Sequence, residues 1–163
     1  MSRQRAPGVL LWGSVLAAWL LALLPVPAAL AGFKPFWLGL VVAYWALETP
    51  ERMGLGRAFV LGLLADLVAG TLLGEQAVRL CILVFLVARF RPRLRFFPLA
   101  QQSLAMLVLL ANDRAVTWAI RVASGEGVPP AGFWLAPVAG MLLWPWLFLL
   151  LDRLSARMRT REG

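Results

Sequence analysis

The sequence predicts an all-α, polytopic membrane protein with six transmembrane helices in one bundle and both termini in the cytoplasm. The first observation behind this prediction is composition: 61% of the 163 residues are hydrophobic, 15% are charged, and the mean hydropathy is +0.80. A soluble chain is roughly half apolar and about a quarter charged. The second observation is that the apolar residues form continuous runs between short polar connections. We therefore expect a single integral membrane domain over residues 1–163.

Six apolar segments follow one another along the chain. They cover residues 9–31, 33–47, 58–73, 77–88, 97–111 with an extension to 120, and 133–151. A membrane-spanning helix needs roughly 20 mostly apolar residues to cross a hydrocarbon core of about 30 Å. At 1.5 Å per residue, the second and fourth segments are only about 18–23 Å long. We expect these two to bury polar flanks against protein, to thin the bilayer, or to be broken helices.

The first segment has a second interpretation. Arg3 and Arg5 precede it, and prolines and small residues at positions 25–31 end it. This pattern resembles a cleavable signal peptide, although the apolar stretch is long for one. Cleavage would leave five spans in the same orientation.

Charge placement predicts the orientation. Twelve of the 16 basic residues fall on one side of the segments: Arg3, Arg5, Arg52, Arg57, Arg89, Arg91, Arg93, Arg95, Arg153, Arg157, Arg159 and Arg161. The other four, Lys34, Arg79, Arg114 and Arg121, lie on the opposite side or within segments. Cytoplasmic loops carry the excess of Lys and Arg, so we expect both termini inside. The net charge of +8 then reflects topology, and no nucleic-acid partner is expected.

The third segment carries an acid among small residues. Asp66 lies at its middle, and small residues recur every four positions around it: Gly54, Ala58, Gly62, Asp66, Gly70 and Gly74. This spacing lets another helix approach closely, so we expect a helix-packing or partner interface. An ionisable group at that depth costs about 2.5–3.5 kcal/mol and usually faces the bundle interior. We interpret Asp66 as part of a proton or ion relay or, preferentially, as a helix-locking partner of Gln101, Gln102, Arg79 or Arg114.

Three further polar side chains are predicted to lie in the membrane. Arg79 follows Glu75 by four residues, which favours a helix-surface pair whose arginine reaches toward the interface. Gln101 and Gln102 either bind a polar head group or, preferentially, form bonds between helices. In the fifth segment, the triplet 112–114 (Asn-Asp-Arg) either ends the span or is buried and paired.

The arginine-rich run before the fifth segment has two interpretations that are compatible. Arg89, Arg91, Arg93 and Arg95 predict a contact with anionic lipid or a cytoplasmic protein, since each basic residue near such a surface adds about 1 kcal/mol. They also act as a topology anchor. Five tryptophans are interpreted as an aromatic belt near the span ends: Trp37, Trp45, Trp134, Trp144 and Trp146.

Composition argues against catalysis. The chain has no His and one Cys, Cys81, which removes the usual zinc and haem ligand sets and the nucleophiles that depend on His. Acid–base chemistry needs positioned groups of suitable pKa, and a membrane-embedded enzyme is therefore disfavoured. We expect no catalytic residue, metal or cofactor.

Several motifs, in order, carry a family resemblance. They are the stretch 36–54, with the run Tyr44-Trp45-Ala46-Leu47-Glu48-Thr49-Pro50-Glu51-Arg52-Met53-Gly54, the glycine–aspartate segment 58–74, Phe97-Pro98-Leu99-Ala100-Gln101-Gln102, and Leu143-Trp144-Pro145-Trp146-Leu147-Phe148. Together they resemble the rod shape-determining protein MreD family over nearly the whole chain. Phe85, where a Tyr is expected, and the charged triplet 112–114 depart from the family pattern.

The resemblance implies a non-enzymatic subunit of the elongasome in the bacterial inner membrane, which builds lateral peptidoglycan. It implies direct binding to MreC and, through it, links to MreB, RodA and the elongation transpeptidase. Contact with membrane lipid is expected, and a homodimer is left open. The family fold is similar to the substrate-binding components of ECF transporters, although fold does not fix function. The alternative is a substrate-binding subunit of a small-molecule transporter, which predicts a polar pocket between helices that opens to the outer side.

Overall fold

The computed structural model describes residues 5–70, 72–129 and 131–161, and within these ranges the chain is all-α. Six α-helices and two short 3₁₀ helices follow one another: α1 Arg5–Leu23, η2 Ala28–Phe33, α2 Trp37–Glu48, α3 Leu55–Ala69, α4 Glu75–Leu94, α5 Leu99–Ala123, η3 Ala131–Leu135 and α6 Ala136–Arg161. Each α-helix corresponds to one of the six predicted apolar segments. The all-α prediction is confirmed for the described part of the chain.

The helix boundaries differ from the predicted segments where helix-breaking or polar residues lie. α1 ends at Leu23, because Pro25 and Pro27 lack the backbone N–H that a continuing helix needs. α4 begins two residues before the apolar segment 77–88 and ends six residues after it, and its 20 residues span about 30 Å. α5 continues unbroken through the polar triplet 112–114.

The short helix α2 is the centre of the molecule. All ten residues 38–47 are buried, so the helix is covered on every side. α1, α4 and α6 pack around it. Its 12 residues span only about 18 Å. η2 and residues 34–36, which precede α2 in the chain, continue from its N-terminus toward one end of the molecule. A helix that is apolar all round is expected in such a position.

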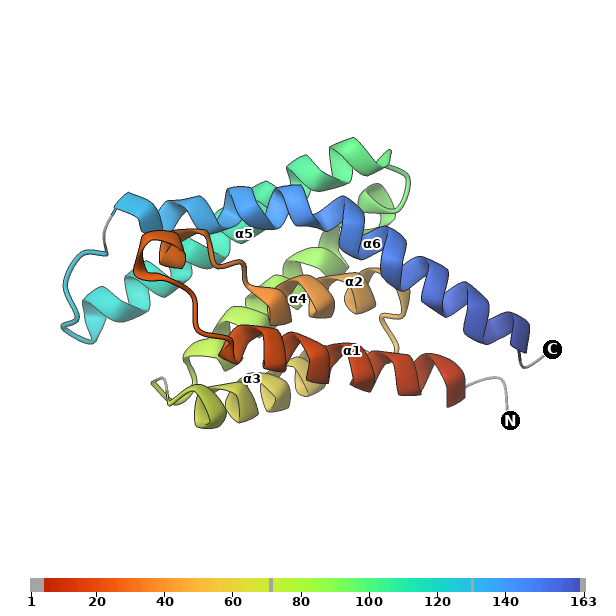
Figure 1. Cartoon of the computed structure of the whole chain (residues 1–163), viewed down its shortest axis with the longest axis horizontal. Coiled ribbons are helices and arrows are strands. Elements are labelled where there is room, and N and C mark those ends of the chain that lie inside the picture. The colour runs from red at the N-terminus through yellow and green to blue at the C-terminus, as the bar shows by residue number, and fades with distance from the viewer. Residues whose placement is uncertain (1–4, 71, 130, 162–163) are drawn as a thin grey trace.

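The chain runs repeatedly between the two ends of the molecule (Figure 1). α1 begins and α6 finishes at the same end, where the α2–α3 and α4–α5 connections also lie. η2, the α3–α4 turn and the α5–η3 loop lie at the opposite end. The basic connections predicted to be cytoplasmic are therefore gathered at one end of the fold.

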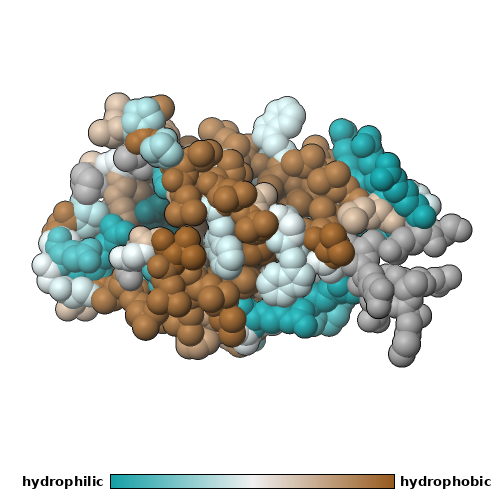
Figure 2. All heavy atoms as spheres, turned by 60° about the horizontal axis from the view of Figure 1, so that its bottom comes forward, coloured by the Kyte–Doolittle hydropathy of each residue, from teal (hydrophilic) through white to brown (hydrophobic). Residues whose placement is uncertain are grey.

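The outer surface of the bundle is strongly apolar. Figure 2 shows brown, hydrophobic surface across the middle of one face, with teal, hydrophilic side chains gathered toward the two ends. Exposed residues of α1 and α3 contribute, among them Leu16, Leu20, Val60 and Leu67. By length and composition, α5 and the stretch Ala131–Arg161 could cross a membrane, and α1 and α2 include shorter apolar helices. These features are consistent with a membrane protein.

Two of the five tryptophans do not form an aromatic belt. Trp45 and Trp144 are each only 1% exposed, and each links helices inside the core. The Trp45 indole N–H donates to Ser14 Oγ at 2.8 Å, which joins α2 to α1. Trp134 and Trp146 are exposed, as the belt interpretation requires.

Candidate functional site

The small residues around Asp66 do not form one helix face. Only Ala58, Gly62 and Asp66 lie within α3. Gly54 precedes the helix, while Gly70 and Gly74 flank the α3–α4 turn with φ of +67° and +97°. Glycine adopts this left-handed conformation without the steric cost that other residues meet. The prediction of a continuous face is therefore wrong for these three glycines, and Gly70 and Gly74 serve to reverse the chain.

Gly62 is the point of closest approach between α3 and α4. A Cβ atom on Gly62 would lie 2.5 Å from the Ala77 backbone nitrogen and closer still to its Cα. Real Cβ atoms do not approach backbone so closely, so only glycine fits here. Ala58, fully buried one turn earlier, continues the same seam. The predicted helix-packing interface is therefore found at Ala58 and Gly62, and the helix that packs against it is α4.

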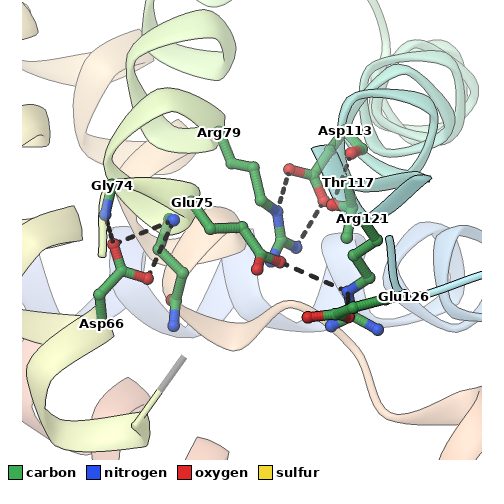
Figure 3. A network of polar contacts seen from close by, with 9 residues as sticks. Asp66, Gly74, Glu75, Arg79, Asp113, Thr117, Arg121 and Glu126 are labelled. Atoms are coloured by element: carbon green, nitrogen blue, oxygen red, sulfur yellow. Dashed lines mark hydrogen bonds and ion pairs between the residues drawn. The ribbon is translucent and has the colours of Figure 1, made fainter. Parts of the chain in front are cut away.

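Asp66 caps the N-terminus of α4 (Figure 3). Its carboxylate accepts hydrogen bonds from the backbone N–H of Gly74 at 2.9 Å and of Gln76 at 3.1 Å. The first N–H groups of a helix have no partner within the helix, and the helix dipole favours negative charge there. Asp66 is 1% exposed. Its bonds fix the α3–α4 turn, as the helix-locking interpretation holds, although the donors are backbone amides rather than the side chains expected.

Changing Asp66 to leucine should lower stability by about 0.5–2 kcal/mol, the range measured for a lost helix cap. Asp66→Asn should lose less, because the amide oxygen still accepts hydrogen bonds. Thermal unfolding of the purified chain in a neutral detergent measures both. If the two variants unfold at the same temperature as the unchanged chain, the cap contributes nothing.

A buried ion pair joins α4 to α5. Arg79 Nε and Nη2 donate to the two carboxylate oxygens of Asp113 at 2.9 and 2.8 Å, a bidentate pair. Arg79 is 8% and Asp113 3% exposed, and the guanidinium also lies 4.2 Å from the ring centroid of Phe36. The triplet 112–114 thus lies within a helix, with its acid buried and paired. Arg79 Nη1 also lies 3.8 Å from Glu75 Oε1, the pair that the sequence predicted. The Arg79 side chain points inward to Asp113, however, and not toward the interface.

More charged groups extend this pair toward the end of the molecule (Figure 3). Arg121 Nε lies 3.7 Å from Glu75 Oε1 and 3.8 Å from Glu126 Oε2, distances too long for hydrogen bonds. Thr117 donates to the Asp113 carbonyl at 2.9 Å. Glu75 Oε1 and Arg121 Nε are buried without a hydrogen-bond partner in the described structure. Arg79 and Asp113 are therefore joined by two short hydrogen bonds, whereas Arg121 has only the two longer ion-pair contacts.

A cavity of about 290 Å³ opens beside this network. Its lining includes four basic residues and three aromatic ones: Lys34, Arg79, Arg114, Arg121, Trp19, Phe36 and Trp37. A second hollow of about 600 Å³ shares Arg114 and Arg121 with it and is lined by residues of η2, η3 and the loop before η3. The four basic residues are the ones that charge placement left off the predicted cytoplasmic side. The sequence pattern did not predict that they meet around a single cavity.

The remaining predicted residues lie toward the opposite end. Gln102 is buried, donates to the Leu94 carbonyl at 2.9 Å and accepts from Trp144 at 3.4 Å, so it forms bonds between helices as preferred. Gln101 is exposed. Arg91 donates to the Leu47 carbonyl at 2.7 Å, which places its charge at the C-terminal end of α2, where the helix dipole favours a cation.

The other arginines of the run are exposed, but the run is not a simple loop. Arg89, Arg91 and Arg93 lie within α4, and Arg95 follows directly after it. Arg89, Arg93 and Arg95 remain available for contact with lipid or protein, while Arg91 holds α4 to α2.

A family model described as rod shape-determining protein MreD matches residues 3–154. The chain belongs to this family. It is also 31% identical over 155 residues to the Rod shape-determining protein MreD of Haemophilus influenzae (strain ATCC 51907 / DSM 11121 / KW20 / Rd), covering 93% of this chain and 96% of that relative. No solved structure matches the chain. Membership of the MreD family and the name of this relative support a role in determining rod cell shape.

Proposed function

We propose that the chain is a non-enzymatic subunit of the bacterial elongation machinery that binds MreC in the inner membrane. Through MreC it would connect to MreB, RodA and the elongation transpeptidase, and so contribute to cell shape and lateral peptidoglycan synthesis. The observation that carries this proposal is the match to the MreD family over residues 3–154.

The distribution of polar groups supports a scaffold. The buried polar side chains Asp66, Arg79, Asp113 and Gln102 all bond between helices or across the α3–α4 turn. The face seen in Figure 2 is apolar across its middle, and α1, α3, α4, α5 and α6 all carry exposed large hydrophobic side chains. Association of helices in lipid depends on close packing and a few polar bonds. A bundle whose buried polar groups bond within the protein, and whose surface carries exposed apolar side chains, is suited to packing against a partner helix in lipid.

The MreC interaction is testable by recovery from native membranes. The tagged full chain, solubilised in mild detergent, should bring down a single-span periplasmic protein with a coiled coil, identified by mass spectrometry as MreC. A mock pull-down from cells with the untagged chain is the control. Recovery of the chain without MreC would contradict the scaffold proposal.

The proposed topology has six spans, one membrane domain and both termini in the cytoplasm. The alternation of the helices between the two ends and the gathering of basic connections at one end support it (Figure 1). In a Cys81→Ser background, a single cysteine at Glu126 should react with a membrane-impermeant maleimide in intact spheroplasts. A cysteine at Glu51 should react only after lysis. The reverse pattern would contradict this orientation.

A second candidate function is favoured by the cavity beside Arg79. The transporter alternative predicts a polar pocket between helices at the outer end. A cavity lined by four basic residues lies at the end of the fold that the proposed topology would place outside. Binding or uptake of a vitamin-sized ligand by cells with the intact chain would support it. Equal uptake in cells with and without the chain would count against it.

A further inference from the structure

The cavity of about 290 Å³ has an unbalanced charge. Among the described residues that line it, Lys34, Arg79, Arg114 and Arg121 are basic and none is acidic. Of the acids that lie near these groups, Asp113 and Glu75 are buried and Glu126 is exposed, and none of the three belongs to the lining. An anion within the cavity would therefore face cations and no carboxylate of the lining.

Two of the four cations already have acidic partners. Arg79 is neutralised by its bidentate pair with Asp113, and Arg121 lies between two carboxylates, though at 3.7 and 3.8 Å. The cavity therefore draws little net charge from either residue.

The other two cations form no ion pair with a carboxylate in the described part of the chain. The Lys34 ammonium donates to the backbone carbonyl of Ala22, a neutral group. The Arg114 guanidinium lies 4.6 Å from the centroid of the Phe133 ring. A half-buried guanidinium without an anion is costly in apolar surroundings. Lys34 and Arg114 thus provide charge that a bound anion would offset.

The rest of the lining is apolar and aromatic. Trp19, Phe36 and Trp37 lie beside the basic residues. The lining therefore combines cations and apolar, aromatic surface. This combination fits a ligand with an anionic head and an apolar body.

We propose that this cavity binds an anionic amphiphile, with a phosphate-class head group held between Lys34 and Arg114 and the apolar part against the tryptophans. A lipid phosphate and a small soluble phosphate ester share this head-group chemistry. Placing the site in the outer leaflet rests on the proposed topology, whereas binding itself does not. The second hollow, which shares Arg114 and Arg121 with this cavity, lies beside it.

Native mass spectrometry of the full-length chain tests the proposal. The chain is titrated with dioleoylphosphatidylglycerol and, separately, with dioleoylphosphatidylcholine in the same neutral detergent. We expect one phosphatidylglycerol to be retained at lower lipid concentration than the zwitterionic lipid. Lys34→Gln and Arg114→Gln should each weaken retention about fivefold, the effect of removing one cation near an anionic head group.

A matched control separates this site from general attraction to the basic end. Arg157→Gln removes one exposed positive charge at the opposite end of the fold, near the end of α6, and should change retention by less than about twofold. Equal losses in Arg157→Gln and Arg114→Gln would overturn the proposal, as would equal retention of the two lipids by the unchanged chain.

A soluble-anion arm identifies the source of the head group. Glycerol 3-phosphate at millimolar concentration should raise the unfolding temperature of the unchanged chain but not of the Lys34→Gln/Arg114→Gln variant if the ligand is a free phosphate ester. Phosphatidylglycerol alone should do so if the ligand is a lipid. If neither compound raises the unfolding temperature, the proposal is overturned. MreC recovery with the double variant is scored separately, so failure of the cavity and failure of the scaffold are distinguishable.

Discussion

Replacing Arg79 with leucine should destabilise the protein by about 3–5 kcal/mol, the cost of leaving one member of a buried ion pair without its partner. Asp113 is 3% exposed and accepts both of its short hydrogen bonds from Arg79. With leucine at position 79, the carboxylate would have to remain charged in the bundle or take up a proton. Asp113→Leu should lower the stability by a similar amount, because it leaves the Arg79 guanidinium buried without its carboxylate partner.

The double variant is the decisive control. Arg79→Leu/Asp113→Leu removes both charges, and such paired replacements are often neutral or stabilising. It should therefore unfold at a higher temperature than either single variant, as measured by thermal unfolding in detergent. Arg57→Leu, which changes an exposed arginine outside this network, should have little effect. Losses that simply add up in the double variant would show that the two side chains act independently.

The sequence predicted the six helices well because long apolar runs carry that information locally. It predicted the seam at Gly62 for the same reason, since small residues four apart lie on one helix face. It failed at Gly70 and Gly74, where the same spacing continues beyond the end of the helix. Spacing alone does not show that α3 ends at Ala69.

Pairings between distant elements were the harder part. The sequence left open whether Asp113 is buried and paired. As partners of Arg79 it indicated Glu75, because that acid is near in sequence, and Asp66 as one of several alternatives. The bidentate bond spans 34 residues, and the packing of α4 against α5 decides it. The four basic residues of the cavity are likewise separated along the chain. The scarcity of basic residues on one side of the predicted spans was the available signal, and by itself it indicates topology rather than a shared cavity.

Replacing Gly62 with leucine should be the most damaging change in α3. Even a single Cβ at this position meets the Ala77 backbone at 2.5 Å or less, and backbone cannot turn aside as a flexible side chain does. Overpacking of a tight core usually costs about 1–3 kcal/mol and occasionally more. We expect a value at or above the top of that range, because α3 and α4 must separate as rigid bodies.

Gly56→Leu is the matched control for this prediction. Gly56 lies in the same helix, and a Cβ atom added there would have nothing within 4 Å. The change therefore adds the same side chain without a clash and should leave the unfolding temperature almost unchanged. Equal stability of the Gly62 and Gly56 variants would refute the close approach itself.

Gly62→Leu also tests whether the α3–α4 seam at Gly62 and the Asp66 cap depend on each other. Separation of α3 from α4 would also pull Asp66 away from the Gly74 and Gln76 amides. Gly62→Leu should therefore show little further loss of stability when Asp66→Asn is added, because the hydrogen bonds that this second change weakens would already be broken. A full additional loss would mean that the seam and the cap are independent.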